Sequence, residues 1–365
     1  MSRRGPTLFA AVSGVEIGVD AMTTTDADPT GTGPVWLLPI DAATYVPHEV
    51  HASERVWTET NCYIDVWVEV LHALGHDPIP AMAAALASDF QGDQWLFVKF
   101  DLTDLRTLYG IDVNEMNVWR PTIDHVEEQL RAGRLMTIEA DSWFLPDTAG
   151  VSYQLAHAKS TIVPQSLDRA TRRLGYFHNA GYFELSGDDF DGVFRLGPYA
   201  DDRWLPPYAE LVRFGRAAES SNEFFARGIS VIHRNFALRP EDNPAQRLIE
   251  RLRADMVWLA GSDVDTFHRY AFGMIRQFGV AAELSGTVAQ WVIDHVPDND
   301  LDTDGRTELS TAAERFFEAA GMAKSIQFRL ARLVSGRKVD IDESLDVMAV
   351  TWQTAMDAIA RWAGR

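Results

Sequence analysis

The chain of 365 residues contains one cysteine, Cys62, in the stretch TETNCYIDVW. From this residue onward apolar side chains recur every three or four positions as far as Leu74, which predicts an amphipathic helix that begins at Cys62. Thr60 or Asn61 supplies the oxygen that caps its first N–H groups. The positive end of a helix dipole favours a thiolate over a thiol. The position of Cys62 therefore predicts a nucleophile, with a buried packing cysteine as the alternative.

A nucleophilic thiol requires a base and a third group that orients the base. His157 opens the segment HAKSTIV and Asn179 closes the segment RLGYFHN, and the turn-forming SLDRATR between them predicts an antiparallel hairpin. We expect the two ends of this hairpin to meet, which predicts a triad of Cys62, His157 and Asn179 in the chain order of papain-like cysteine catalysts. Strand alternation leaves open whether His178 or Asn179 faces His157. Alternatively, His157 is a structural residue at a strand edge and Asn179 is a turn residue.

Acidic residues accompany a predicted strand. The segment LMTIEADSWFL, residues 135–145, is rich in β-forming residues and predicts a central strand. Glu139 and Asp141 alternate along it, which suits the binding of an amine, although acids near a strand end are equally consistent with a structural role. Further helices are predicted near residues 78–87 and 121–133.

Charge and composition exclude several classes of function. The 53 acidic against 33 basic residues give a net charge of −20, which repels phosphate backbones and anionic membrane surfaces. One cysteine forms no internal disulfide, and no apolar run approaches the roughly 20 residues of a spanning helix. No phosphate-cradling glycine loop or cluster of metal ligands stands out. We therefore expect a cytoplasmic protein that binds neither nucleic acid nor membranes and uses no metal or cofactor.

The pattern divides the chain into three parts. Residues 1–34 are expected to be a disordered leader, or the start is misassigned and Met22 is the first residue. Residues 35–205 carry the cysteine helix and the strands, and are expected to form an α+β, papain-like catalytic domain. After about Pro206 strand signals vanish and long amphipathic patterns begin, so residues 206–365 are predicted to form a helical bundle.

Several long stretches resemble one bacterial family. They are TETNCYIDVWVEVLHALGHDP, FQGDQWLFVKF, ADSWFLPDTAG, HAKSTI, GYFHNAGYF and AKSIQFRLARLV. Together they look like domain-of-unknown-function family 1839, over nearly everything from about Leu38 to Trp362. More distantly, the Asn-Cys pair that opens a helix, followed by an acidic strand, a histidine and a strand ending in Asn, is similar to butirosin-type acyltransferases. These are papain-like proteins that move an aminoacyl group from a carrier-protein thioester to an amine.

The resemblance implies roles for particular residues. Cys62 would be the nucleophile, His157 the base and Asn179 the orienting group, where the distant relatives usually have Asp. The residues expected to bind substrate are Asn61, Gln94, Asp141, Trp143, Asp147 and His178.

The expected activity is the transfer of an acyl or aminoacyl group from a thioester to an amine through an acyl-Cys62 intermediate. The expected partners are an acyl or aminoacyl carrier protein and a small-molecule amine acceptor. A cysteine hydrolase and a non-catalytic binding module are the alternatives. Basic side chains at Arg169, Arg172 and Arg173, and again within residues 324–338, are either docking sites for an acidic carrier or partners of the surplus acids.

Overall fold

The structure is a computed structural model in which residues 33–201, 203, 205–296 and 301–364 are described. The expected leader up to residue 32, and the choice between Met1 and Met22 as the start, lie outside these residues. The first element is strand β1 (Val35–Trp36), at the position where the sequence predicts that folded structure begins.

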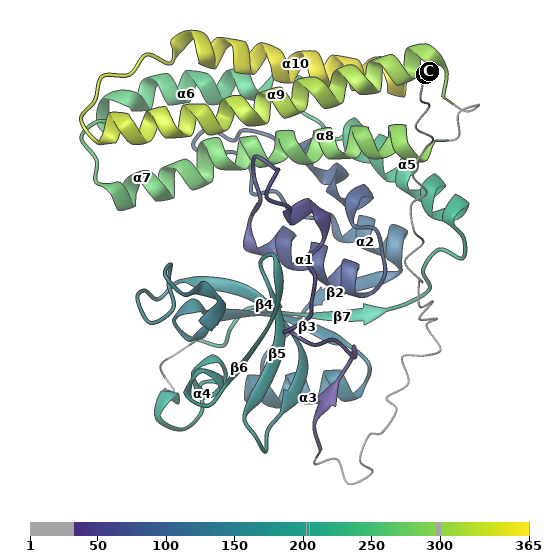
Figure 1. Ribbon diagram of the computed structural model, residues 1–365, viewed down its shortest axis with the longest axis vertical. Coiled ribbons are helices and arrows are strands. Elements are labelled where there is room, and N and C mark those ends of the chain that lie inside the picture. The colour runs from purple at the N-terminus through teal and green to yellow at the C-terminus, as the bar shows by residue number, and fades with distance from the viewer. Residues whose placement is uncertain (1–32, 202, 204, 297–300, 365) are drawn as a thin grey trace, which may run out of the picture.

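An antiparallel sheet forms the lower half of the molecule in Figure 1. Its order is β2-β7-β3-β4-β5-β6, and β1 pairs with β4. The strands are β2 (Ile111–Glu115), β3 (Leu135–Asp141), β4 (Lys159–Asp168), β5 (Arg173–His178), β6 (Gly181–Ser186) and β7 (Ala209–Phe214). The predicted central strand is β3, which lies between β7 and β4, and the predicted hairpin is β4–β5. Both predictions are confirmed.

The α+β part of the chain extends to Phe214 instead of ending at residue 205. Strand β7 lies inside the sheet, between β2 and β3, so the prediction that strands end near Pro206 is wrong. The six-residue strand AELVRF gives a weak signal because Glu210 and Arg213 interrupt its apolar residues. Its place in the sheet comes from pairing with strands that lie some 70 to 100 positions earlier.

Helices cover the sheet on both sides. Helix α1 (Cys62–Ala73) packs on β4, β5 and β6, and α3 (Thr122–Arg131) packs on β1, β3 and β4. Figure 1 shows α1 on the side toward the long helices, and α3 and α4 (Asp188–Phe194) on the other side. The remaining short elements here are α2 (Leu102–Tyr109), η2 (Glu49–His51), η3 (Ile79–Ala87), η4 (Ser142–Phe144), η5 (Pro146–Thr148) and η6 (Gly197–Tyr199).

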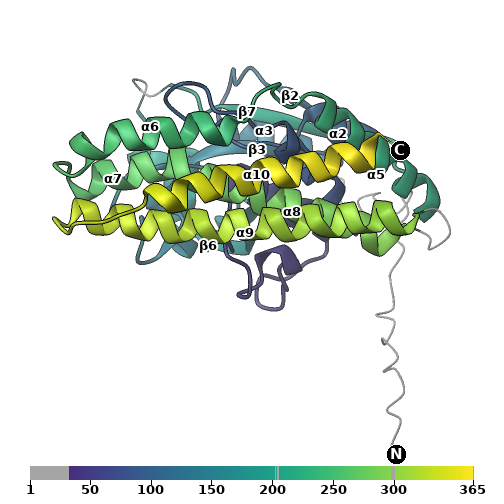
Figure 2. The same ribbon diagram turned by 90° about the horizontal axis from the view of Figure 1, so that it is seen from above.

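Long helices form the other half, as predicted. They are α5 (Ser221–Ala237), α6 (Pro244–Leu259), α7 (Val264–Ala271), α8 (Gln277–His295), α9 (Thr303–Val334) and α10 (Asp342–Ala363), and the π-helical segment η7 (Phe272–Arg276) joins α7 to α8. Figures 1 and 2 show α8, α9 and α10 running side by side above the sheet. On α9 an apolar stripe that includes Phe316, Ala323 and Leu330 is buried, as the amphipathic pattern of this region predicts.

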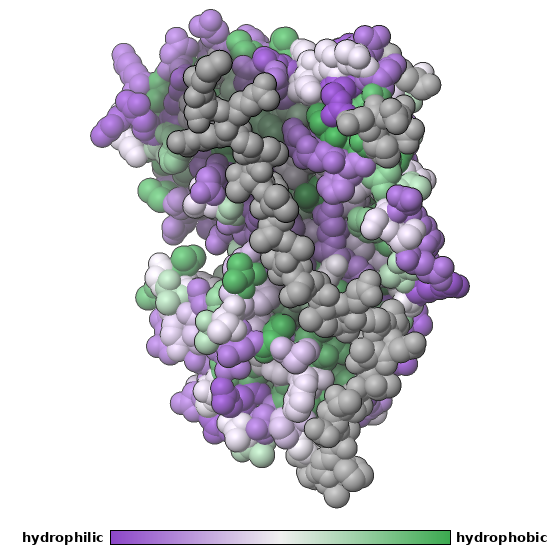
Figure 3. Space-filling view, turned by 45° about the vertical axis from the view of Figure 1, so that its right-hand side comes forward, coloured by the Kyte–Doolittle hydropathy of each residue, from purple (hydrophilic) through white to green (hydrophobic). Residues whose placement is uncertain are grey.

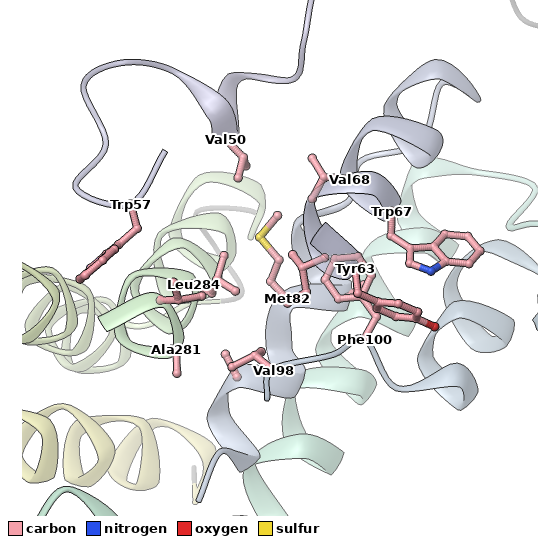
Figure 4. Packing of buried hydrophobic residues seen from close by; sticks show 14 of the residues in the cluster. Val50, Trp57, Tyr63, Trp67, Val68, Met82, Val98, Phe100, Ala281 and Leu284 are labelled. Carbon is pink, nitrogen blue, oxygen red and sulfur yellow. The ribbon is translucent and has the colours of Figure 1, made fainter. Parts of the chain in front are cut away.

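The two halves share one hydrophobic core. Figure 4 shows Trp57, from the segment before α1, beside Leu284 of α8, and Val50 of the same segment near Val68 of α1. The approach is close at Gly279, where a Cβ atom would lie 2.6 Å from the indole of Trp57. Segment η3 also packs on α5 and α8. The sheet and the bundle therefore hold the start of α1 in a fixed place.

Polar side chains are frequent on one face of the molecule. Figure 3 shows hydrophilic side chains over much of one face, with hydrophobic groups scattered among them. Within the described part of the chain, none of the helices has the length and hydrophobicity that crossing a membrane requires.

Candidate functional site

Helix α1 begins at Cys62, as predicted, because Asn61 caps it. The Asn61 Oδ1 atom accepts hydrogen bonds from the N–H groups of Tyr63 and Ile64, at 3.1 and 3.0 Å. Its Nδ2 atom donates to the carbonyl of Val98 at 3.0 Å. Asn61 is buried and its polar atoms are used in this way, so it positions Cys62 and does not line the cavity in front of the thiol.

Cys62 is partly exposed and faces the sheet. Its Sγ atom lies 3.9 Å from Oγ1 of Thr161 on β4. A small cavity of about 50 Å³ opens beside the thiol. It is lined by Cys62, Tyr63, Phe97, Lys99, Thr137, Glu139, Lys159, Thr161, Tyr208 and Glu210.

The floor of this cavity is a polar patch on three adjacent strands. Strands β3 and β4 each contribute two alternate residues, Thr137 and Glu139 and then Lys159 and Thr161. Strand β7 contributes Glu210, and Tyr208 lies just before this strand. In the ladders Glu210 lies opposite Thr137, and Glu139 lies opposite Thr161, so the six side chains share one face. Under a packed helix this face would normally be apolar, and its polarity therefore marks a candidate site.

The charges on the floor are arranged in two groups. Lys159 Nζ lies 2.6 Å from Glu139 Oε1, which forms an ion pair at the mouth of the cavity. Deeper in, the Glu210 carboxylate accepts hydrogen bonds from the hydroxyls of Thr137 at 2.8 Å, Tyr208 at 3.1 Å and Tyr63 at 3.4 Å.

Both tyrosines on Glu210 are donors at neutral pH. Burial and the negative charge of Glu210 raise the pKa of Tyr208 to about 12. The same two causes, burial first, raise the pKa of Tyr63. Lys99 Nζ lies 4.3 Å from the centre of the Tyr63 ring, which gives this wall of the cavity a cation–π contact.

A larger pocket of about 610 Å³ adjoins the small cavity. The two share Glu139, Lys159 and Tyr208. The larger pocket is lined in addition by Ala140, Asp141, His157, Ala158, Arg195, Leu205, Pro206 and Pro207. The thiol therefore lies at the narrow end of a cleft. The cleft widens toward the last residues of β3 and the first residues of β4.

His157 and Asp141 form a pair in the wide part of the cleft. His157 Nδ1 lies 2.6 Å from Asp141 Oδ2, and the second carboxylate oxygen accepts the N–H of Trp143 at 3.1 Å. The imidazole stacks on the Trp143 ring with 4.5 Å between centroids and 11° between planes. The His157 side chain is 63% exposed. The predicted site residues Asp141, Trp143 and His157 thus lie together, and Asp141 makes the contact with His157 that we expected of Asn179.

His157 and Cys62 are not hydrogen-bonded to each other. The thiol lies beside Thr161, and His157 is held by Asp141. Cys62 lines the small cavity and His157 lines the adjoining larger pocket. The direct contact between base and nucleophile that the predicted triad requires is therefore not present in this structure.

Asn179 and His178 lie away from the cleft that contains Cys62 and His157. Asn179 lies in the tight turn between β5 and β6 with a φ of 44°, so its conformation is that of a turn residue. His178 is 1% exposed, with Nδ1 2.5 Å from Asp147 Oδ2 and Nε2 2.6 Å from Ser160 Oγ. Tyr176 also donates to Asp147. Asp147 and His178 line neither part of the cleft, contrary to prediction.

Gln94 is exposed and lies in a turn in which its carbonyl accepts the N–H of Gln91. The next residue, Trp95, bonds to Gly273 of the bundle, so this turn faces the helices. Gln94 therefore lines neither part of the cleft, contrary to prediction.

Sequence reasoning missed most of the polar patch. Thr137, Lys159, Thr161, Tyr208 and Glu210 were not predicted as site residues. The available signal was the alternation of polar residues along LMTIEAD, which puts Thr137, Glu139 and Asp141 on one face of β3.

These features define an α+β protein that presents a lone cysteine at a helix N-terminus, above a polar patch of an antiparallel sheet. The DUF1839 N-terminal domain matches residues 46–214, and the DUF1839 C-terminal domain matches residues 221–361. The chain belongs to this family, as its resemblance indicated. The first matched region ends at Phe214, which is also the last residue of β7. Among curated proteins, no sequence matches the chain.

Proposed function

We propose that this protein is a papain-like cysteine acyltransferase in which Cys62 accepts an acyl group from a thioester and passes it to an amine. The observation that carries the proposal is the place of Cys62, a partly exposed thiol at the first residue of a capped helix and at the narrow end of a cleft. A helix N-terminus favours the thiolate, which is the attacking species. A packing cysteine would require none of the surrounding polar side chains.

The reaction has two balanced steps. First, the Cys62 sulfur attacks the thioester R–CO–S–R′, the C–S bond to R′ breaks, and the thiol proton leaves with the product HS–R′. Second, an amine attacks R–CO–S–Cys62, the new C–S bond breaks, and the amine loses one proton while the Cys62 thiol regains one. A carrier protein is the proposed source of the thioester.

Backbone geometry supports stabilisation of the oxyanion in each step. The first N–H groups of a helix have no acceptor within the helix. Asn61 Oδ1 accepts hydrogen bonds from the N–H groups of Tyr63 and Ile64. The N–H of Cys62 would then donate to the oxygen of the tetrahedral intermediate.

The His157–Asp141 pair has a different role from the one predicted. Because it lies in the wide part of the cleft, we assign it to binding the acceptor and not to deprotonating Cys62. Donor and acceptor would reach the thiol through the same pocket, one after the other. Ping-pong kinetics are therefore expected.

The test is turnover of a small acyl thioester, acetyl-N-acetylcysteamine, with and without ethanolamine as the amine probe. Release of the free thiol and formation of the amide are measured in parallel for wild type and Cys62→Ala. We expect amide formation only with wild type. Wild-type turnover by Cys62→Ala would refute the proposal, and an acid product in place of the amide would assign the protein to the cysteine hydrolases.

A further inference from the structure

Glu210 is a buried carboxylate whose charge is not matched by a cation of the protein. Its residue is 4% exposed and three hydroxyl groups bond to it. Over the described parts of the chain, Glu210 forms no salt bridge. The two lysines that line the same cavity are directed elsewhere, Lys159 to Glu139 and Lys99 to the ring of Tyr63.

Such an arrangement is suited to a cation brought by a ligand. Burying a carboxylate is costly even when neutral donors satisfy its oxygens, so a positive charge beside it is strongly favoured. The hydroxyls of Thr137, Tyr208 and Tyr63 also fix the carboxylate in place, which lowers the cost of ordering it on binding. Because Glu210 and Cys62 line one cavity, that cation would belong to a group held at the thiol.

The size of the cavity limits this group. A single water molecule needs roughly 10–15 Å³ of such space, so the 50 Å³ beside Cys62 holds about three to five non-hydrogen atoms. A glycyl group has four such atoms. Phe97 and Tyr63 line this cavity, so the side chain of a larger acyl group would not fit within the 50 Å³ beside them.

We propose that the acyl group carried by Cys62 is a small ammonium-bearing one, of the size of glycyl, and that Glu210 binds its ammonium. This inference rests on the proposed function and specifies its substrate. In the loading step the Cys62 sulfur attacks the carbonyl carbon of a glycyl thioester, and the bond from that carbon to the donor sulfur breaks. The products are glycyl-Cys62 and the free donor thiol, which takes the proton of Cys62, while the ammonium is unchanged. Glu210 takes no part in bond breaking and acts as a binding residue.

The test compares two acyl groups of equal size. Glycyl and propionyl differ only by an ammonium in place of a methyl group. The rates at which their N-acetylcysteamine thioesters acylate Cys62 are measured by intact mass, and each is divided by its rate with glutathione, which removes the difference in intrinsic reactivity. We expect wild type to prefer glycyl by about tenfold to a hundredfold, as for a hydrogen bond to a charged group.

A variant tests whether Glu210 causes the preference for the glycyl thioester over the propionyl thioester. In Glu210→Gln the glycyl preference, which is the ratio of the two normalised rates, should fall at least tenfold, and a circular dichroism spectrum like that of wild type shows that the variant is folded. Glu184→Gln, an exposed β6 carboxylate paired with Arg173, serves as the matched control and should keep the preference. Leucyl thioester should react more slowly than glycyl thioester with wild type.

The outcomes separate the two proposals. Equal normalised rates for glycyl and propionyl in wild type would overturn the ammonium site and leave the acyltransferase intact. A glycyl preference that survives in Glu210→Gln would also overturn the assignment. Absence of a Cys62 adduct with all three thioesters would instead refute the proposed function itself.

Discussion

The thiol of Cys62 lies 3.9 Å from the hydroxyl of Thr161, so a threonine occupies the sheet position that faces the nucleophile. His157 lies four residues earlier in the chain and is held by Asp141. The histidine pair and the thiol are therefore at two ends of one cleft. This separation leads to predictions that a contiguous triad would not make.

The two half-reactions should respond differently to loss of His157. In His157→Ala we expect the rate of Cys62 acylation by a thioester to stay within about twofold of wild type, because the imidazole does not touch the thiol. Amide formation should become slower and the KM for the amine should rise by roughly tenfold, since a binding contact is lost. The measurement is single-turnover acylation by mass, followed by steady-state kinetics with varied ethanolamine.

Thermal stability provides the control for His157→Ala. The side chain is largely exposed, so the melting temperature should change little. Loss of acylation with an unchanged melting temperature would show that His157 serves the thiol after all.

Sequence patterns predicted the elements well and their register poorly. Helical periodicity and the asparagine cap locate the start of α1 at Cys62, and turn residues locate the β4–β5 hairpin. These signals are local. Which residue of β4 faces Cys62 depends on how α1 lies across the sheet, and that is set by packing against the bundle at Trp57 and Gly279.

The same limit explains the missed site residues. Glu210 belongs to a short strand in which charged residues interrupt the apolar ones, and its partner strands come much earlier in the chain. The polar alternation of Thr137, Glu139 and Asp141 was visible in the sequence. Only the pairing of β3 with β7 and β4 shows that Glu210, Thr161 and Lys159 complete the same patch.

The contact that holds α1 against the bundle can be tested with glycine substitutions. Gly279→Ala would place a Cβ atom 2.6 Å from the Trp57 indole, so we expect a loss of about 1–3 kcal/mol in the free energy of unfolding. Gly321→Ala is the matched control, because it lies in helix α9 with no neighbouring atom within 4 Å and should gain about 0.4–1 kcal/mol. Denaturant unfolding measures both, and equal effects of the same sign would contradict the packing described.

Stability should fall at alkaline pH because of His51. Its Nδ1 lies 2.5 Å from Glu69 Oε1 and its Nε2 lies 3.3 Å from Asp65 Oδ1. Burial disfavours the protonated ring, but the two carboxylates outweigh burial and raise the pKa of His51 to about 9. Since this pKa lies above the unfolded value of about 6.5, the stabilisation is complete below pH 6.5 and is lost as the pH rises through 9.

The expected loss between pH 6 and pH 9.5 is about 3 kcal/mol in the free energy of unfolding. Denaturant titrations of wild type and His51→Gln at several pH values measure it. The wild-type curve should fall over this range and the variant curve should be flatter. Identical slopes for the two proteins would rule out His51 as the titrating group.

The basic residues of the β4–β5 turn should not dock a carrier. Arg173 pairs with Glu184 at 2.6 Å, and Arg172 lies 3.3 Å from Asp188 and 3.4 Å from Asp191. The turn is also at the far end of β4 from Lys159 and the cleft. Arg172→Glu with Arg173→Glu is therefore expected to change the KM for a carrier-bound thioester less than twofold. A large rise in that KM, with the small thioester unaffected, would place the docking site at this turn.

The most direct test of the account is the intact mass of the protein after brief incubation with glycyl- or acetyl-N-acetylcysteamine. We predict the addition of one acyl unit, removed by neutral hydroxylamine as a thioester is, and absent in Cys62→Ser. Because the chain has a single cysteine, an acyl group that hydroxylamine removes as a thioester is assigned to Cys62. An unmodified wild-type mass under these conditions, or an adduct that persists in Cys62→Ser, would contradict the claim that Cys62 carries the acyl group.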